Sequence, residues 1–154
     1  MKASRAYRLA PHLTLTLLLL GLLHAPAQAA EKVTIKVTVA QASGPNAENP
    51  KVDPQLAPYK KVLSALGGFG QFSFVGRDSK QVGEGEQATL NAGAYQCEVT
   101  VAKIEDGAAS VNWVLKKGGE EVGKGGFKLK AGSVVPQQLG DPKAPLIPLF
   151  ERGN

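Results

Sequence analysis

The chain has 154 residues, of which 43% are hydrophobic, with a formal net charge of +5 and a single cysteine. This length and apolar content support one compact domain with a hydrophobic core and exclude a disordered chain. The net charge is a weak guide to function, because three basic residues and both histidines lie within the first 29 residues.

Residues 1–29 predict a cleaved signal peptide. Three basic residues precede an apolar block at residues 13–23, and small residues follow it, which is the three-part plan of a secretory leader. The block is interrupted by threonines and a glycine and falls short of the roughly 20 apolar residues that a membrane-spanning helix needs. We therefore expect cleavage after Ala29 and no transmembrane anchor in the remaining chain.

Removal of this leader changes what the chain can do. The formal net charge falls by 3, from +5 to +2, so nucleic-acid binding is not expected. His12 and His24 are also removed, and with them histidine as a general base or metal ligand. We expect an exported protein in the periplasm, with the cell surface and the extracellular medium as alternatives.

A strand is predicted at residues 30–39. Lysine and threonine alternate there with apolar residues, as in a strand with one buried face, and these apolar residues are Val33, Ile35, Val37 and Val39. Residues 40–53 contain two prolines and no apolar periodicity, and they predict a linker. Such a tether lets the strand pair within its own sheet, which we favour, or serve as a partner strand for another protein's sheet edge.

One short α-helix is predicted after the linker. Asp53 is a suitable N-cap, and apolar residues recur at three- and four-residue spacing over residues 56–66. Two glycines then end the helix. Because Pro58 lacks a backbone donor, the regular helix is expected to start only near Ala57.

The rest of the chain predicts short antiparallel strands. Two alternating runs flank Asp106-Gly107, a dipeptide that favours a tight hairpin turn, and residues 76–85 carry turn residues. Pro145 and Pro148 restrict the last apolar stretch to an edge strand or to a segment outside the ladder. The predicted fold is mainly β, an antiparallel β-sandwich that is Ig-like or related, in which residues 54–154 form one domain with the N-terminal strand.

Four roles are considered for Cys97. A lipid anchor requires a cysteine at the cleavage site, and an intramolecular disulfide requires a second cysteine, which the chain lacks. An intermolecular disulfide and a reactive thiol stay open, although no imidazole is available to help form a thiolate. Strand alternation places Cys97 on the face of Val99 and Val101, so a buried core position is favoured.

No catalytic residue, metal site or cofactor is predicted, and we do not expect an enzyme. Glu84, Glu86 and Glu98 are the candidates for a carboxylate pair in glycoside hydrolysis, but solvated carboxylates on turns and strand faces are favoured. The chain has neither a histidine and cysteine cluster nor the motif of a calcium-binding loop.

Five lysines make one hairpin locally basic, and they are Lys116, Lys117, Lys124, Lys128 and Lys130. They are candidate contacts to an anionic surface such as lipid headgroups or acidic polysaccharide. Alternating lysines also protect an open sheet from edge-to-edge association, and this solvated-face interpretation is favoured.

The order of parts over residues 53–135 resembles a group of small exported bacterial proteins of uncharacterised function. The resemblance is carried by the helix segment DPQLAPYKKVLSAL, the strand FGQFSFV and the strands with glycine-rich turns that follow. The prolines of GDPKAPLIPLF depart from the group, whose last segment is an aliphatic strand after a glycine-rich turn. The resemblance implies a signal peptide, one short helix and a β-meander, and it supplies no catalytic residues.

These features predict a non-catalytic binding or assembly component of a cell-envelope machine of the pilus, secretion or motility type. Its expected partners are other envelope proteins, with strand addition as one mode of contact. The alternative is a β-sandwich that binds carbohydrate or an anionic surface, for which Trp113, Tyr95 or Tyr59 must be exposed as a stacking platform. A hydrolytic enzyme ranks third.

Overall fold

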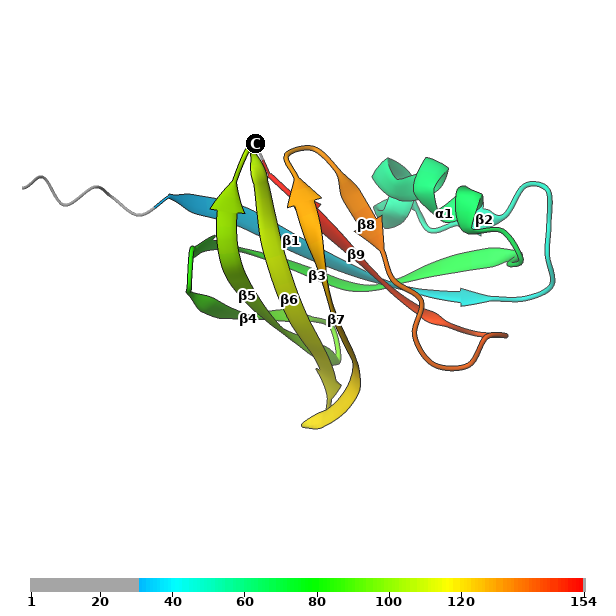
Figure 1. Cartoon of the computed structure of the whole chain (residues 1–154). Coiled ribbons are helices and arrows are strands. Elements are labelled where there is room, and N and C mark those ends of the chain that lie inside the picture. The colour runs from blue at the N-terminus through cyan, green and yellow to red at the C-terminus, as the bar shows by residue number, and fades with distance from the viewer. Residues whose placement is uncertain (1–30, 154) are drawn as a thin grey trace, which may run out of the picture.

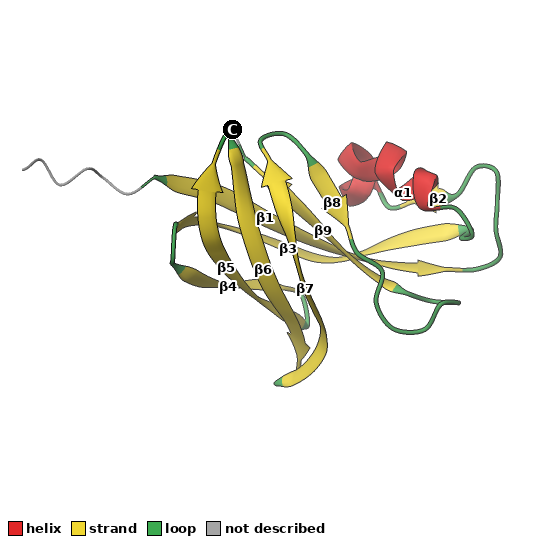
Figure 2. Cartoon of the chain, viewed as in Figure 1, coloured by secondary structure: helices red, strands yellow, loops and turns green. Residues whose placement is uncertain are grey.

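A computed structural model describes residues 31–153, so the predicted signal peptide lies outside the described residues. Two β-sheets pack face to face, and one short helical segment lies against one of them (Figure 1, Figure 2). This arrangement confirms the predicted mainly-β, sandwich-like fold with one short helix.

The sheet of five strands, sheet A, has the order β2-β3-β1-β9-β8, and the sheet of four strands, sheet B, has the order β4-β5-β6-β7. The elements are β1 (Lys32–Ser43), β2 (Lys51–Val52), a 3-10 helix η1 (Pro54–Tyr59), α1 (Lys60–Leu66), β3 (Gln71–Gly83), β4 (Gln87–Ala92), β5 (Tyr95–Glu105), β6 (Ala108–Lys117), β7 (Glu120–Lys130), β8 (Val134–Pro136) and β9 (Leu146–Arg152). Neither helical segment in the described part of the chain has the length and apolar run that a membrane crossing requires.

Strand β1 is the centre of sheet A. It pairs antiparallel with β3 on one side and with β9 on the other. Its predicted apolar row faces sheet B, and all of its members are buried: Val33, Ile35, Val37 and Val39. The apolar residues of the alternating sequence therefore face the interior of the sandwich, and the lysines and threonines between them lie on the opposite face of sheet A.

The prediction that a linker starts at residue 40 is wrong for residues 40–43, which continue β1. Ala40 and Ala42 are fully buried there, on the face of sheet A that the helical segment covers. Both faces of the strand are covered in this part, so the apolar and polar alternation that marks a half-buried strand disappears. The loop itself is shorter than predicted, because residues 51–52 form β2, parallel to the start of β3.

The helical segment differs from the predicted single α-helix. Asp53 caps it as expected, because its side chain accepts a hydrogen bond from the backbone N–H of Gln55 at 2.8 Å. The first six residues form η1, and α-helical hydrogen bonding starts only at Lys60, two residues after Pro58. A proline nitrogen cannot donate to the carbonyl four residues earlier, which explains the delay. Leu56 and Leu63 pack this segment onto sheet A.

The predicted turn region at residues 76–85 is mostly strand. Strand β3 runs to Gly83, and the turn is confined to the few residues before β4. The long β3 bends at a bulge opposite the Val39–Ala40 step of β1, where Val75 is the extra residue. The polar residues of this half of β3 alternate between both faces of the strand, and most of them are exposed because the cover of sheet A is incomplete here, so they do not mark a turn.

The prediction of an edge position for the last strand is wrong. Strand β9 lies inside sheet A, between β1 and β8, and Pro148 pairs with Val39. The Pro148 carbonyl accepts a hydrogen bond from the Gln137 N–H at 3.0 Å, on the side away from β1. Because the nitrogen and oxygen of one residue point to the same side of an antiparallel strand, the nitrogen that lacks a proton also faces away from β1. The main ladder is therefore intact.

Sheet B is a meander of tight hairpins. The predicted turn at Asp106-Gly107 is confirmed, with φ values of 52° and 70° that match a type I′ turn, and Gly118-Gly119 forms a second such turn with φ values of 57° and 88°. The inner face of sheet B packs on the apolar row of β1 and on Phe150 of β9. The core of the sandwich therefore contains residues from both the first and the last described strand, packed against sheet B.

Candidate functional site

The structure places the predicted partner strand inside the protein's own sheet. Val33 is 3% exposed, and the other three apolar residues of the row are fully buried. Donation of β1 to another protein would require breaking its ladders with both β3 and β9. The described strand is thus engaged in its own domain, and a contact by strand addition must use another edge.

Four of the five candidate lysines share one surface, the outer face of sheet B, which points away from sheet A. Strand register places Lys124 opposite Val114 and Lys128 opposite Ser110, and the same face carries Lys116 and Lys130. Lys117 lies on the other side, with its ammonium 5.5 Å from the centre of the Tyr95 ring. The structure therefore brings together four of the five predicted contacts.

Carboxylates balance part of this basic surface. The Lys116 ammonium donates to Glu98 of β5 at 2.5 Å, and the Lys124 ammonium lies 3.1 Å from Glu121. Lys128 and Lys130 form no ion pair with any residue of the described chain. Positive charge is consequently concentrated at the end of β7.

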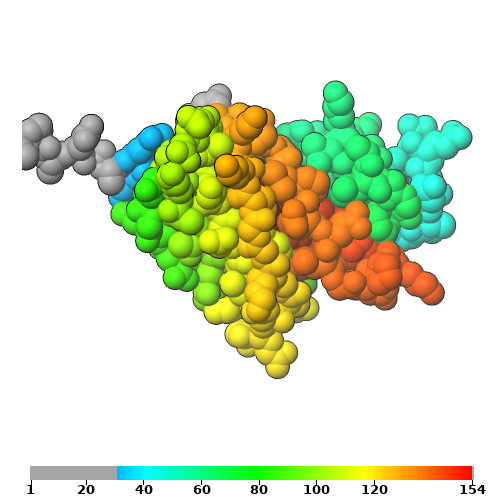
Figure 3. All heavy atoms as spheres, viewed as in Figure 1, coloured from blue at the N-terminus to red at the C-terminus, as the bar shows by residue number. Residues whose placement is uncertain are grey.

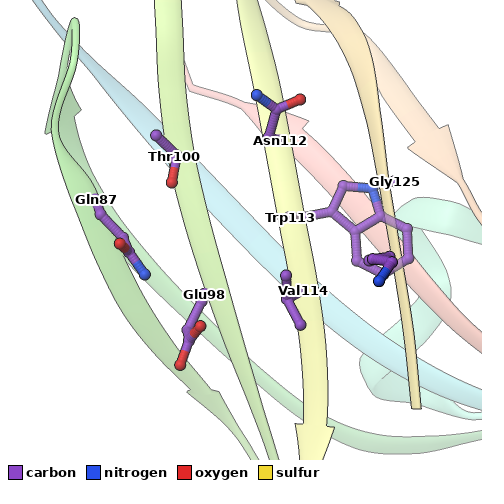
Figure 4. Close-up of a pocket in the computed structure, with 8 residues that line it drawn as sticks. Gln87, Glu98, Thr100, Asn112, Trp113, Val114 and Gly125 are labelled. Atoms are coloured by element: carbon purple, nitrogen blue, oxygen red, sulfur yellow. The ribbon is translucent and has the colours of Figure 1, made fainter. Parts of the chain in front are cut away.

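A depression of about 320 Å³ lies on the outer face of sheet B (Figure 4). Polar side chains from β4, β5, β6 and β7 line it: Gln87, Glu98, Thr100, Asn112 and Lys124. These groups can exchange hydrogen bonds with a polar ligand. They include no exposed aromatic ring, because Trp113, which also borders the depression, is only 2% exposed.

The aromatic residues that a carbohydrate site requires are not available as platforms. Trp113 and Tyr59 are 2% and 3% exposed, and Tyr95 is half-buried under Lys117. The Trp113 indole lies against Gly125 of β7 (Figure 4), where a Cβ atom would come within 3.1 Å of the ring. Its Nε1–H has no hydrogen-bond partner among the described residues. Trp113 therefore acts as a core residue, and Gly125 leaves the space that its ring fills.

The free edge of β7 distinguishes this strand from the edges of sheet A. There β2 has two residues and β8 has three, the last of which is Pro136, so both edges are short. Strand β7 has eleven residues and no proline. Gly125 and Gly126 are exposed, and Val122, at 43%, is the most exposed large hydrophobic residue within residues 31–153. Figure 3 shows β7 as an exposed yellow-to-orange band that rises from the β6–β7 turn.

The three carboxylates considered for glycoside chemistry are engaged separately. Glu84 accepts from the Ile104 N–H and Glu86 from the Gly83 N–H, each at 2.8 Å, while Glu98 binds Lys116. The hydrogen bond from Gly83, aided by Lys32, lowers the pKa of Glu86. Each carboxylate thus caps a turn or joins two strands.

Cys97 lies in the core, as strand alternation predicts. Its side chain is fully buried between Leu90 of β4 and Leu115 of β6, the residues opposite it in the ladders. Burial, with a smaller contribution from the Glu98 charge, raises the pKa of the thiol to about 12. The thiolate that is needed for nucleophilic attack or disulfide exchange does not form near neutral pH.

We expect native Cys97 to resist alkylation. At pH 8 the labelling rate with a maleimide or iodoacetamide should be at least about a hundredfold lower in buffer than in denaturant, because both access and ionisation are lost on folding. Intact-mass measurement over time checks this expectation. Rapid native labelling, or a dimer that dissociates on reduction, would contradict the buried position.

A polar network that sequence reasoning missed connects η1 to sheet A. The Tyr59 hydroxyl donates to Glu151 Oε2 at 2.8 Å, and the buried Thr38 hydroxyl lies 3.2 Å from the Tyr59 oxygen. The Lys36 ammonium lies 2.7 Å from the same Glu151 oxygen. No spacing along the chain relates residues 36, 59 and 151, so the sequence contains no signal for the cluster.

The network shifts the ionisation of both charged members. A hydrogen bond with Glu151 raises the pKa of Lys36, although burial opposes this effect. Burial alone would raise the pKa of Glu151, but hydrogen bonds from Lys36 and Tyr59 outweigh it and hold the pKa below the ordinary value of 4.5. The cluster stabilises the ionised pair and ties the helical segment to the sheet.

The stability of the protein should therefore depend on pH through Glu151. Because the folded-state pKa is below 4.5, this stabilisation is complete above pH 4.5 and is lost as the pH falls through the folded-state value. Urea unfolding at a series of pH values should show that Glu151→Gln removes this part of the acid dependence, at a cost of at most about 1 kcal/mol for a partly exposed pair. Glu105→Gln, which alters an exposed pair with Lys103, is the matched control. Equal acid dependence in both variants would contradict the assignment.

Comparisons of the chain with protein-family models, with curated proteins and with solved structures found no significant match.

Proposed function

We propose that the protein is exported and acts in the cell envelope as a non-catalytic binding or assembly component. The observation that carries this proposal is the free edge of β7, which at eleven residues is the longest of the four edge strands in the two described sheets, since β2, β4 and β8 have two, six and three. An exposed edge strand offers unpaired backbone N–H and C=O groups to an extended segment of another protein. In this mode the domain receives a strand and does not donate one.

The location follows from the leader-like residues 1–29, which lie outside the described residues. Strand β1 starts at Lys32, so cleavage after Ala29 would leave every described element intact. The buried, protonated thiol of Cys97 is also suited to an oxidising compartment, because it is protected from exchange. Fractionation and N-terminal sequencing of the exported protein test this part, and a chain retained with Met1 in place would contradict it.

A second candidate function is binding to a polar or anionic surface through the outer face of sheet B. The depression lined by Gln87, Asn112 and Lys124, and the uncompensated charges of Lys128 and Lys130, favour it. The absence of an exposed aromatic ring in this depression favours the assembly role over carbohydrate stacking. A glycan array and anionic vesicles provide direct tests of this candidate.

The assembly role is tested by crosslinking in cells. A photo-crosslinking residue at Val122 samples the edge of β7, and the same residue at Lys61, exposed on α1, is the matched control. Adducts identified by mass spectrometry as envelope proteins should form from position 122 and not from position 61. Identical adducts from both positions, or none from position 122, would contradict the proposal.

A further inference from the structure

We propose that β7 pairs antiparallel with β7 of a second copy of this chain, so that two sheets B join into one continuous sheet. This inference rests on the proposed function and names the partner of the same edge. It follows from the distribution of charge and side-chain volume along β7.

The charges of β7 are arranged head to tail. Glu120 and Glu121 open the strand, and Lys128 and Lys130 lie near its end. A two-fold axis places residue i of one copy beside residue j of the other, and j beside i. With the axis at Gly125, the acidic end of each strand lies beside the basic end of its partner. A parallel arrangement would instead place like charges together, which is unfavourable across strands.

The middle of β7 has little volume to obstruct this contact. With the same axis, Lys124 lies opposite Gly126, which has no side chain, so the two Lys124 ammonium groups do not face each other. On the inner side, Gly123 and Gly125 are covered by Leu139 and Trp113 of their own chain. The backbone edges can therefore approach while each core remains closed.

The lysines of β7 do not prevent self-association in this arrangement. Lysines protect an edge when a second copy presents further lysines to it. Here the antiparallel partner presents Glu120 and Glu121 to the basic end. The exposed Val122 lies opposite Lys128, whose aliphatic stem can cover it while the ammonium stays in water.

The test is a charge exchange measured by sedimentation velocity on protein expressed from the full-length sequence. The unmodified protein should form a dimer at low ionic strength. Glu120→Lys with Glu121→Lys, and separately Lys128→Glu with Lys130→Glu, should each weaken the dimer about tenfold or more. A mixture of the two variants should form a heterodimer, because every end of one then meets the opposite charge of the other.

Lys60→Glu with Lys61→Glu on α1 is the matched control, since it changes the net charge as much as the lysine variant of β7 and should leave the dimer intact. Circular dichroism must show the same fold in all variants. A monomeric unmodified protein, a dimer insensitive to the β7 charges, or no recovery on mixing would overturn the inference.

If the protein is monomeric but position 122 crosslinks to another envelope protein, the inference fails and the proposed function stands. If the dimer behaves as expected but no other envelope protein is captured, the self-pairing stands and the role in a larger assembly fails.

Discussion

Gly76→Ala should strongly destabilise the protein. A Cβ atom at position 76 would lie 2.1 Å from the backbone nitrogen of Gly93 and 2.3 Å from the carbonyl carbon of Ala92. Both atoms belong to the backbone of the β4–β5 turn, so no side-chain rotation can relieve the collision. Sheet B would have to move away from β3, and the cost should reach or exceed the upper end of the roughly 1–3 kcal/mol typical of overpacked cores. A domain of this size is stable by only about 5–15 kcal/mol.

Gly83→Ala provides the matched control because it lies on the same strand. The new methyl group would meet only the carboxyl end of the Glu86 side chain, at 3.0 Å, and that end can move. We expect a loss below about 1 kcal/mol for this variant. Urea unfolding followed by circular dichroism compares the two. If Gly76→Ala is as stable as Gly83→Ala, the two backbones do not approach at this point.

The features predicted correctly from the sequence are those set by neighbouring residues. The alternation of residues 33–39 depends on one buried and one open strand face, and Asp106-Gly107 forms its turn because both residues tolerate positive φ. The position of Cys97 follows from the same alternation. In each case, information over fewer than about ten residues decides the local structure.

The features predicted wrongly depend on distant residues. Ala40 and Ala42 continue β1 because the helical segment covers them, and nothing near them in the sequence shows this cover. Pro148 is tolerated inside the sheet because its nitrogen faces away from β1, a fact set by the pairing of β9 with β1. Proline content alone could not distinguish this case from an edge strand.

The candidate site was predictable only in part for the same reason. The basic composition of the hairpin is visible in the sequence, but the shared face of the lysines depends on the register of β7, which shifts by one residue near Val122. The status of β7 as a free edge depends on strand order in sheet B. Glu151 meets Lys36 only because the last strand pairs with the first.

Phe150→Ala should be the most destabilising truncation in the core of the sandwich. Phe150 is fully buried on β9, and its ring centre lies 5.1 Å from that of Trp113 and 5.0 Å from that of Phe127, both on sheet B. The side chain thus fills the space between the two sheets, on the strand that pairs with β1. Removal of a buried phenylalanine ring costs about 3–5 kcal/mol, because apolar burial is lost and a cavity remains.

Trp113 reports on this change directly, since it is the only tryptophan in the chain. Urea unfolding followed by tryptophan fluorescence should show a much lower midpoint for Phe150→Ala, and the native emission should shift to the red if water reaches the indole. Phe150→Leu retains most of the volume and should lose only about 1 kcal/mol, whereas Val122→Ala on the exposed edge should change stability by less than about 0.5 kcal/mol. A Phe150→Ala variant as stable as Val122→Ala would show that the aromatic contact between the sheets does not hold the sandwich together. We therefore expect the loss of stability to be largest for Phe150→Ala, smaller for Phe150→Leu and smallest for Val122→Ala. This order would show that the inner face of sheet B stabilises the fold, whereas the edge of β7 is free to serve as a contact.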